Sequence, residues 1–318
     1  MRVLITGVTG FLGAELARQC LAAGWEVFGL ARSPQPQTHN LGALRYEQVA
    51  LTDAAALADC LLRVKPEIVF HLAAITEPRD DLQQLALVNV GGAHNLFQAA
   101  QMLASAPLVF LVSSSAVYGA ARSDTPRIDE QTPLVPVTPY AQTKVMLEQL
   151  ALTVEQTKRV AVIRVRPFNI VGPGQPAKYA FSAFARQLVR IEAHLQPPIL
   201  ETGELTAARD FVDVRDVASA CIALVRSGEP GTADNICSGV ATSMREGLDL
   251  LVKLSGLGTN LTIRERSTSN QMVNVPAQLG DFSRLQTHTG WTPTYQLQQS
   301  LSDLLDDWRQ RLKLGQAL

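Results

Sequence analysis

A glycine-rich turn close to the N-terminus constrains the fold of this chain more than any other feature. An apolar segment ends at Thr6, and an amphipathic stretch begins at residue 11. In a strand–turn–helix unit, the first glycine permits a tight turn, the second lets backbone N–H groups approach a pyrophosphate, and the third lets the helix pack closely. The context therefore predicts a dinucleotide-binding turn. We expect its cofactor contacts to come from Gly7, Thr9, Gly10, Phe11, Leu12 and Gly13.

Short apolar segments alternate with amphipathic ones through the first half of the chain. The strand candidates are almost continuously apolar, as expected of strands covered on both faces, and span 3–5, 27–30, 68–72, 108–113 and 160–166. The helix candidates have a 3.6-residue period and span 11–23, 54–64, 89–104 and 140–157. This alternation predicts the α/β class, with a doubly wound parallel Rossmann sheet.

The second half of the chain has a different texture, which begins after Pro167. A Gly/Pro-rich loop at 172–176 precedes a helix at 181–192, a strand is expected at 234–237, and an amphipathic helix at 297–312. We predict a dinucleotide-binding domain with the catalytic residues at 1–170, and a smaller, discontinuous substrate lobe at 171–318. Within that lobe, 208–238 is expected to return to the first domain. A ligand crevice should lie between the two parts.

Composition excludes several classes of partner. The formal net charge is −1, so nothing indicates a nucleic-acid or membrane surface. No apolar run approaches the ~20 residues that span a bilayer. The four cysteines are dispersed without a metal-binding spacing, which indicates buried thiols in a reduced, cytoplasmic chain with no metal site. They are Cys20, Cys60, Cys221 and Cys237.

The end of the second strand candidate indicates which cofactor the chain uses. An acidic residue there would bind the adenosine 2′-hydroxyl, whereas a basic residue accommodates a 2′-phosphate. The segment has Arg32 at this position, and Glu26 lies too early in the strand. We therefore expect NADP(H). The alternative is that Arg32 is a solvated loop residue and NAD(H) binds as well.

A serine run and a Tyr-x-x-x-Lys pair form the predicted catalytic group. The fifth strand candidate ends in Ser113-Ser114-Ser115, and Tyr140 and Lys144 follow at the start of a helix. Residues four apart share a helix face, so both side chains should project toward the strand end. A fixed ammonium is expected to lower the pKa of the tyrosine and make it an acid–base group. The serine hydroxyl would hydrogen-bond the same substrate oxygen.

The chain resembles the extended short-chain dehydrogenase/reductase family, also described as the NAD-dependent epimerase/dehydratase family, over essentially its whole length. The motifs that carry this resemblance are 6–13, His71-Leu72-Ala73-Ala74, Asn89-Val90-Gly91-Gly92, 113–119, Tyr140 with Lys144, and Arg166-Pro167-Phe168-Asn169. The resemblance implies that Ser114 is the catalytic hydroxyl and that Lys144 also holds the nicotinamide ribose. Further cofactor contacts are implied for Leu72, Ala73, Ala74, Asn89, Tyr140 and Pro167.

The same resemblance implies a nucleotide-linked sugar as substrate. Asn169 would contact the sugar or its diphosphate, and Arg209 resembles the arginine that binds the diphosphate, with a structural salt bridge as the alternative. Arg186 is a second diphosphate candidate. Where the family carries an arginine and an acid for the diphosphate and ribose, this chain has Gln271 and Asn274. Neutral amides can still hydrogen-bond the diphosphate, but without the arginine the identity of the nucleotide base and of the sugar stays open.

Three sugar-nucleotide reactions occur in the family. Dehydratases need an acid–base pair immediately after the catalytic hydroxyl, and here Ser115 and Ala116 occupy those positions. A 4-epimerase usually uses NAD with an acid at the second strand, which Arg32 disfavours. Motifs in the second half, including 209–211 and 280–285, resemble reductases that act on GDP-4-keto-6-deoxy-mannose. We therefore expect an NADPH-dependent 4-ketoreductase, with a 4-epimerase and a non-catalytic NADP(H) sensor as alternatives.

Relatives usually pair through two helices, which here correspond to 89–104 and 140–157, so we expect a homodimer. The second helix is apolar at several positions that could equally face the sheet: Val145, Leu147, Leu150, Ala151 and Val154.

Overall fold

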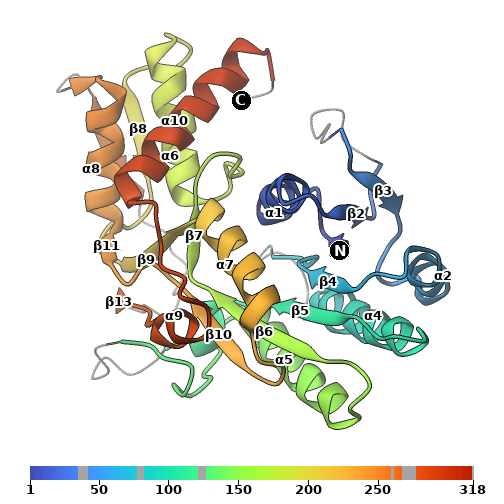
Figure 1. Cartoon of the computed structure of the whole chain (residues 1–318). Coiled ribbons are helices and arrows are strands. Elements are labelled where there is room, and N and C mark those ends of the chain that lie inside the picture. The colour runs from blue at the N-terminus through green and yellow to red at the C-terminus, as the bar shows by residue number, and fades with distance from the viewer. Residues whose placement is uncertain (35–41, 77–81, 121–126, 259–260, 267–276, 317–318) are drawn as a thin grey trace.

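The computed structural model describes residues 1–34, 42–76, 82–120, 127–258, 261–266 and 277–316. Its centre is a seven-stranded sheet in which all neighbouring strands are parallel, in the order β10-β6-β5-β4-β1-β2-β3 (Figure 1). The strands are β1 (Arg2–Thr6), β2 (Glu26–Ala31), β3 (Arg45–Gln48), β4 (Ile68–His71), β5 (Leu108–Val112), β6 (Val162–Pro167) and β10 (Ala233–Ile236). The sheet is doubly wound and parallel as predicted, and the fold class is confirmed.

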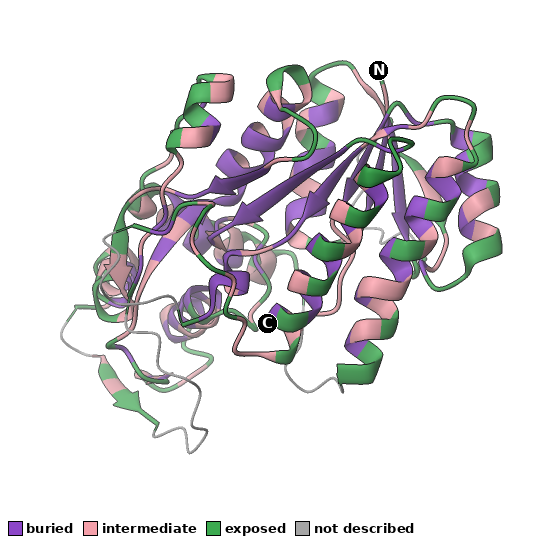
Figure 2. Cartoon of the chain, turned by 90° about the horizontal axis from the view of Figure 1, so that it is seen from below, coloured by how far each residue is buried: buried purple, intermediate pink, exposed green. Residues whose placement is uncertain are grey.

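Helices cover both faces of this sheet, so its strands are buried on both sides (Figure 2). α1 (Phe11–Ala22), α7 (Val214–Ser227) and α9 (Ser283–Thr289) pack on one face. α2 (Ala54–Val64), α4 (Gly92–Gln101) and α5 (Pro139–Gln156) pack on the other. Neighbouring residues of a strand point to opposite faces, and Leu4 and Ile5 are both fully buried. This arrangement explains why the strand segments read as continuous apolar runs.

Two elements of this half differ from the sequence expectation. β3 was not predicted, because this edge strand is exposed or half-buried and carries polar residues. The helix expected at 89–104 starts earlier, as a π-helical turn η2 (Ala86–Gly91) that runs into α4. A short helix, α3 (Leu82–Leu85), precedes the turn, and η3 (Ser115–Tyr118) follows β5 as a 3₁₀ turn. π-Helical turns are rare and occur frequently at functional sites.

The second half adds a further core above the carboxyl edge of the sheet. α6 (Ala180–Glu192), α8 (Met244–Ser255) and α10 (Leu297–Lys313) pack around it with β8 (Ile199–Thr202), which pairs with β12 (Thr262–Glu265). A small sheet joins β7 (Asn169–Val171), β9 (Ala208–Asp213), β11 (Ala241–Ser243) and β13 (Ala277–Gln278). The bounds proposed for the two domains stay a prediction.

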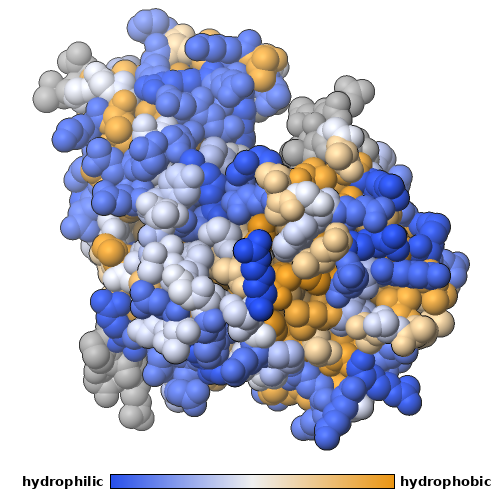
Figure 3. Space-filling model, viewed as in Figure 1, coloured by the Kyte–Doolittle hydropathy of each residue, from blue (hydrophilic) through white to orange (hydrophobic). Residues whose placement is uncertain are grey.

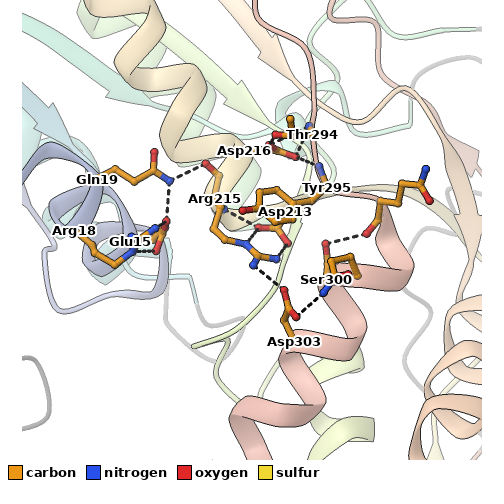
Figure 4. A network of polar contacts seen from close by, with 12 residues as sticks. Glu15, Arg18, Gln19, Asp213, Arg215, Asp216, Thr294, Tyr295, Ser300 and Asp303 are labelled. Atoms are coloured by element: carbon orange, nitrogen blue, oxygen red, sulfur yellow. Dashed lines mark hydrogen bonds and ion pairs between the residues drawn. The ribbon is translucent and has the colours of Figure 1, made fainter. Parts of the chain in front are cut away.

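A polar network ties this second core to the half that carries the seven-stranded sheet (Figure 4). Arg215, at the start of α7, donates to Asp213 over 2.8 Å and to Asp303 of α10 over 2.7 Å. Its guanidinium carbon lies 3.7 Å from the ring centroid of Tyr295. From the other side, Gln19 of α1 donates to the backbone oxygen of Arg215 over 3.0 Å. One arginine thus contacts elements from both halves.

The molecular surface differs between the two halves. On the face shown in Figure 3, the residues over α6, α8 and α10 are mainly hydrophilic, and apolar residues gather in the other half, beside α1 and α7. Among the described residues, no helix combines the length and the apolar character needed to cross a bilayer.

A buried ion pair fixes α5 against the sheet. Arg166 on β6 donates from Nε and Nη2 to the two carboxylate oxygens of Glu148, over 3.0 and 2.6 Å. Arg166 also donates to the Tyr118 hydroxyl over 2.9 Å, and that hydroxyl donates to Asn235 on β10 over 2.7 Å. Both charged side chains are at most 5% exposed. A buried pair of this kind is costly to break from one side.

The variant Arg166→Met removes both hydrogen bonds to the buried Glu148 carboxylate and leaves it only the more distant Arg164, whose Nη1 lies 3.8 Å away. We expect the free energy of unfolding, measured by urea denaturation, to fall by about 3–5 kcal/mol. In the double variant Glu148→Gln/Arg166→Met the poorly compensated charge is gone, so more than half of the lost stability should return. A double variant no more stable than Arg166→Met would contradict this account.

Candidate active site

The glycine turn has the geometry of a pyrophosphate cradle. Gly7 has a φ of +72°, and a Cβ there would lie 2.9 Å from the backbone N of Ala73. A Cβ on Gly13 would lie 2.2 Å from the carbonyl oxygen of Gly7, so α1 packs directly on the turn. Gly10 caps α1 without a side-chain hydrogen bond, which leaves the first N–H groups of the helix for a ligand. An anion fits such a helix start.

The end of β2 presents a cation and no acid. Arg32 directly follows the strand and is exposed, and no carboxylate of the described residues pairs with it. Glu26, at the opposite end of β2, pairs with Arg2 over 3.0 Å and with Arg45 over 2.8 Å. Glu26, the acid of this strand, is therefore held in two ion pairs far from the glycine turn, as its early position in the strand predicted.

The loop after β4 lies against the glycine turn and is held by Asn89. The N–H of Ala73 donates to Thr6 Oγ1 over 3.2 Å. Asn89 accepts from the N–H of Ile75 over 2.8 Å and donates to its carbonyl over 3.1 Å. A second amide hydrogen of Asn89 goes to Thr143 on α5, over 3.1 Å. The π-helical turn thus lets one buried amide join this loop to the helix that carries Tyr140 and Lys144.

The structure brings Ser114, Tyr140 and Lys144 together at the carboxyl ends of the strands. Ser114 caps the 3₁₀ turn after β5, where its hydroxyl accepts from the N–H of Ala116 over 3.2 Å and hydrogen-bonds the Tyr140 side chain. Tyr140 occupies the first turn of α5, and Lys144 Nζ lies 5.7 Å from the centroid of its ring. Lys144 is 4% exposed and donates to the carbonyl of Val112 over 2.7 Å.

The titration of this group differs from the sequence expectation. Burial raises the pKa of Tyr140 above its ordinary value, a nearby Tyr179 raises it further, and the hydrogen bond with Ser114 lowers it. The expectation that Lys144 lowers the pKa of Tyr140 is therefore wrong here, because removal of water disfavours the charged phenolate. Burial also lowers the pKa of Lys144 to about 8, against the effect of Glu148.

The residues expected to hold the substrate lie on several elements. Asn169 starts β7 and donates to the backbone oxygen of Asp210 over 3.2 Å, and Arg209 precedes that aspartate on β9. Burial lowers the pKa of Arg209. Arg186 lies on α6, where its buried Nε has no hydrogen-bond partner among the described atoms. Gln271 and Asn274 fall outside the described residues.

Two side chains near the catalytic group, Lys178 and Tyr179, were not predicted from the sequence. Lys178 donates to Thr76, in the loop after β4, over 3.0 Å, so a segment of the second half reaches across to the first. Tyr179 precedes α6 and lies close enough to Tyr140 for its charge to raise the pKa of that residue. Their position directly after the Gly/Pro-rich loop is the one sequence feature that could have marked them.

The fold and the site together are those of a dinucleotide-dependent enzyme. Residues 3–237 match the family model described as the NAD dependent epimerase/dehydratase family. The chain belongs to this family, which confirms the predicted resemblance. Within the described residues, no three His, Cys, Asp or Glu side chains cluster as metal ligands would.

Individual relatives cover nearly the whole chain. The GDP-6-deoxy-D-mannose reductase of Pseudomonas aeruginosa is 33% identical over 98% of both chains. A UDP-glucose 4-epimerase of Mycolicibacterium smegmatis is 32% identical over 77% of this chain and 80% of its own length. Among solved structures, RMD from Pseudomonas aeruginosa complexed with NADPH superposes with a TM-score of 0.84 at 31% identity, over 98% of this chain and 100% of that one.

The variant Gly13→Ala tests the cradle. Its Cβ would collide with the carbonyl oxygen of Gly7, so α1 must move away from the turn. We expect the dissociation constant for NADPH, measured by fluorescence titration, to rise at least about tenfold, or 1.4 kcal/mol. Gly203→Ala is the matched control, since nothing lies within 4 Å of the added Cβ. Equal affinities of the two variants would show that the turn does not bind the cofactor.

Proposed function

We propose that this chain reduces the 4-keto group of a nucleotide-linked 4-keto-6-deoxy sugar of the GDP-4-keto-6-deoxy-mannose type, with NADPH. The observation that carries the proposal is the placement of Ser114, Tyr140 and Lys144 beside a glycine turn shaped for a pyrophosphate. The similarity to a GDP-6-deoxy-D-mannose reductase and to a solved NADPH complex supports the substrate class and the cofactor.

The residues of the chain fit this reaction. NADPH, when bound, supplies the hydride that adds to C4 of the sugar. Tyr140 donates its hydroxyl proton to O4 as that oxygen gains charge, and Ser114 hydrogen-bonds the same oxygen. Lys144 holds the ribose next to the nicotinamide. Because burial raises the pKa of Tyr140, the tyrosine stays protonated at neutral pH and is ready to donate.

We assign the remaining predicted contacts to the same ligands. Arg32 would pair with the 2′-phosphate, and the segment after β4 would line the cofactor. Asn169, Arg186 and Arg209 would hold the sugar and its diphosphate. Gln271 and Asn274 stay predictions from the resemblance alone.

A nucleotide-sugar 4-epimerase is the second candidate. The 32% identity to a UDP-glucose 4-epimerase favours it, and the absence of an acid at the end of β2 speaks against it. The two reactions differ in stoichiometry: a reductase consumes one NADPH for each sugar, whereas an epimerase interconverts isomers without net oxidation of the cofactor.

We further propose a homodimer in the cytoplasm. Leu147, Ala151 and Val154 of α5 pack into the chain's own core, so they are not dimer contacts. In the segments 89–104 and 140–157, through which relatives pair, the exposed large apolar side chains are Met102 and Met146, at 60% and 48%. Leu87, on η2 just before the first segment, is 63% exposed. The buried free thiols agree with a reducing compartment.

Removal of the Tyr140 hydroxyl tests the catalytic assignment. We expect Tyr140→Phe to lower kcat for GDP-4-keto-6-deoxy-mannose by about 10²–10⁴-fold, the usual contribution of a general acid, while NADPH affinity changes little. The measurement is the loss of NADPH absorbance with GDP-, dTDP- and UDP-linked 4-keto-6-deoxy sugars. If none of these is reduced while NADPH binds tightly, the ketoreductase proposal fails.

Cofactor choice depends on Arg32. We expect Arg32→Ala to raise the dissociation constant for NADPH about tenfold, because a charge-assisted contact to the 2′-phosphate is lost, and to leave NADH affinity unchanged. Arg226→Ala removes an exposed arginine at the end of α7 and serves as the control. An equal loss of affinity for NADPH and NADH would mean that Arg32 does not bind the 2′-phosphate.

A further inference from the structure

Two buried polar atoms at the carboxyl ends of β4 and β5 have no hydrogen-bond partner among the described residues. They are Nε2 of His71 and Oγ of Ser113, and the two residues are 2% and 4% exposed. Buried polar groups are nearly always paired with protein or ordered water, so two orphans at the ends of the neighbouring strands β4 and β5 need an explanation. Neither atom takes part in the proposed reaction.

The strand register places both side chains on the face of the sheet that α5 covers. His71 on β4 lies opposite Leu111 on β5, and Leu111 belongs to the core between the sheet and α5. Side chains alternate along a strand, so Ser113 points to the same face as Leu111. The carbonyl between them, that of Val112, accepts from Lys144 over 2.7 Å. The three polar groups therefore lie on one face of the sheet, at the carboxyl ends of the neighbouring strands β4 and β5.

The hydrogen bonds of Thr6 fix the tautomer of His71. The Thr6 hydroxyl oxygen accepts from the N–H of Ala73 and lies 2.9 Å from Nδ1 of His71. The described residues offer this hydroxyl no other acceptor, so its single hydrogen is directed to Nδ1 and the ring proton resides on Nε2. Burial and the charge of Lys144 lower the pKa of His71 to about 3, which keeps the ring neutral. The orphan on His71 is thus an N–H donor that requires an oxygen.

We propose that His71 and Ser113 are positioning residues for Lys144, and that with its ammonium they enclose a site for one internal water. This water accepts from His71 Nε2 and from Lys144 Nζ, and it donates to Ser113 Oγ. Three polar partners are the usual number for a buried water. The inference rests on the role of Lys144 in cofactor binding given above.

The function of such a site is to keep Lys144 charged. An ammonium has three hydrogens, and an acceptor for one of them favours the charged form. The pKa of Lys144 is already lowered to about 8 by burial, so the loss of an acceptor would neutralise it near physiological pH. The other groups that face it are Tyr140 and Glu148 on its own helix, and Glu148 is paired with Arg166.

The test is the pH dependence of NADPH affinity, which needs no sugar substrate. In the wild type the affinity should fall as pH rises through the pKa of Lys144, about 8, and Lys144→Met should abolish this fall. We expect Ser113→Ala to move the midpoint down by about half a pH unit to one unit. Ser113→Thr retains a hydroxyl and should restore the wild-type midpoint.

His71 is tested by two variants with different geometry. His71→Asn retains an acceptor near Nδ1 for the Thr6 hydroxyl but has no donor at Nε2, so the water is no longer held and the midpoint should fall as in Ser113→Ala. His71→Gln retains a donor near Nε2 and should stay close to the wild type. The matched control is Thr202→Val, which removes another buried, unpartnered hydroxyl, in the second core.

The outcomes separate this inference from the proposed function. If the midpoint is unchanged in Ser113→Ala and His71→Asn, or if the wild type shows no Lys144-dependent fall, the positioning role is wrong. If the midpoints shift as expected but no keto sugar is reduced, the inference holds and the ketoreductase proposal fails. If a keto sugar is reduced while the midpoints do not shift, the ketoreductase proposal holds and the positioning role fails.

Discussion

The ion pair between Glu148 and Arg166 is the interaction on which the geometry of the site depends. It joins α5, which carries Tyr140 and Lys144, to β6, the strand between β10 and β5 in the sheet. Through Tyr118, which follows Ser114 in the same 3₁₀ turn, the pair also fixes the serine segment. A desolvated pair contributes little net stability, since desolvation offsets the attraction. Its role here is to fix the position of α5 against β6, because both hydrogen bonds form only in one arrangement of the helix and the strand.

A second buried carboxylate fixes the strand that carries the proposed substrate residue Arg209 in the same way. Asp210 is fully buried and accepts from the N–H groups of Ser238, Gly239 and Gly280, over 2.8, 2.9 and 3.2 Å. These donors come from segments far apart in the sequence that meet at β9. Arg209, the neighbour of Asp210, is thereby held on a strand whose position is fixed from several sides. Preorganisation of this kind reduces the entropy that a bound ligand would otherwise cost.

Local pattern was enough to predict the parts of the site that depend on sequence spacing. The glycine turn was recognisable because a strand precedes it and a helix follows, and Tyr140 and Lys144 because four residues separate them on one helix face. The two hydrogen bonds between Asn89 and the backbone of Ile75 were not predictable, since they depend on a π-helical turn that shifts the register of the helix. The edge strand β3 was missed because its residues are polar and half-exposed.

The protonation states were the least predictable part, because they depend on burial and not on spacing. The sequence pattern suggests that an ammonium beside Tyr140 lowers the pKa of the phenol, yet in the structure desolvation dominates and raises it. The same desolvation acts on Lys144 with the opposite sign, because its charged form is the protonated one. Burial therefore favours a neutral tyrosine that can donate a proton and a lysine that needs every available acceptor to stay charged. For a reductase, which must deliver a proton to the alkoxide it creates, a tyrosine that holds its proton is an advantage. Donation of that proton leaves the phenolate in the same buried site, so its charge must be stabilised there, beside the Lys144 ammonium 5.7 Å from the ring centroid, until the tyrosine takes up a proton again.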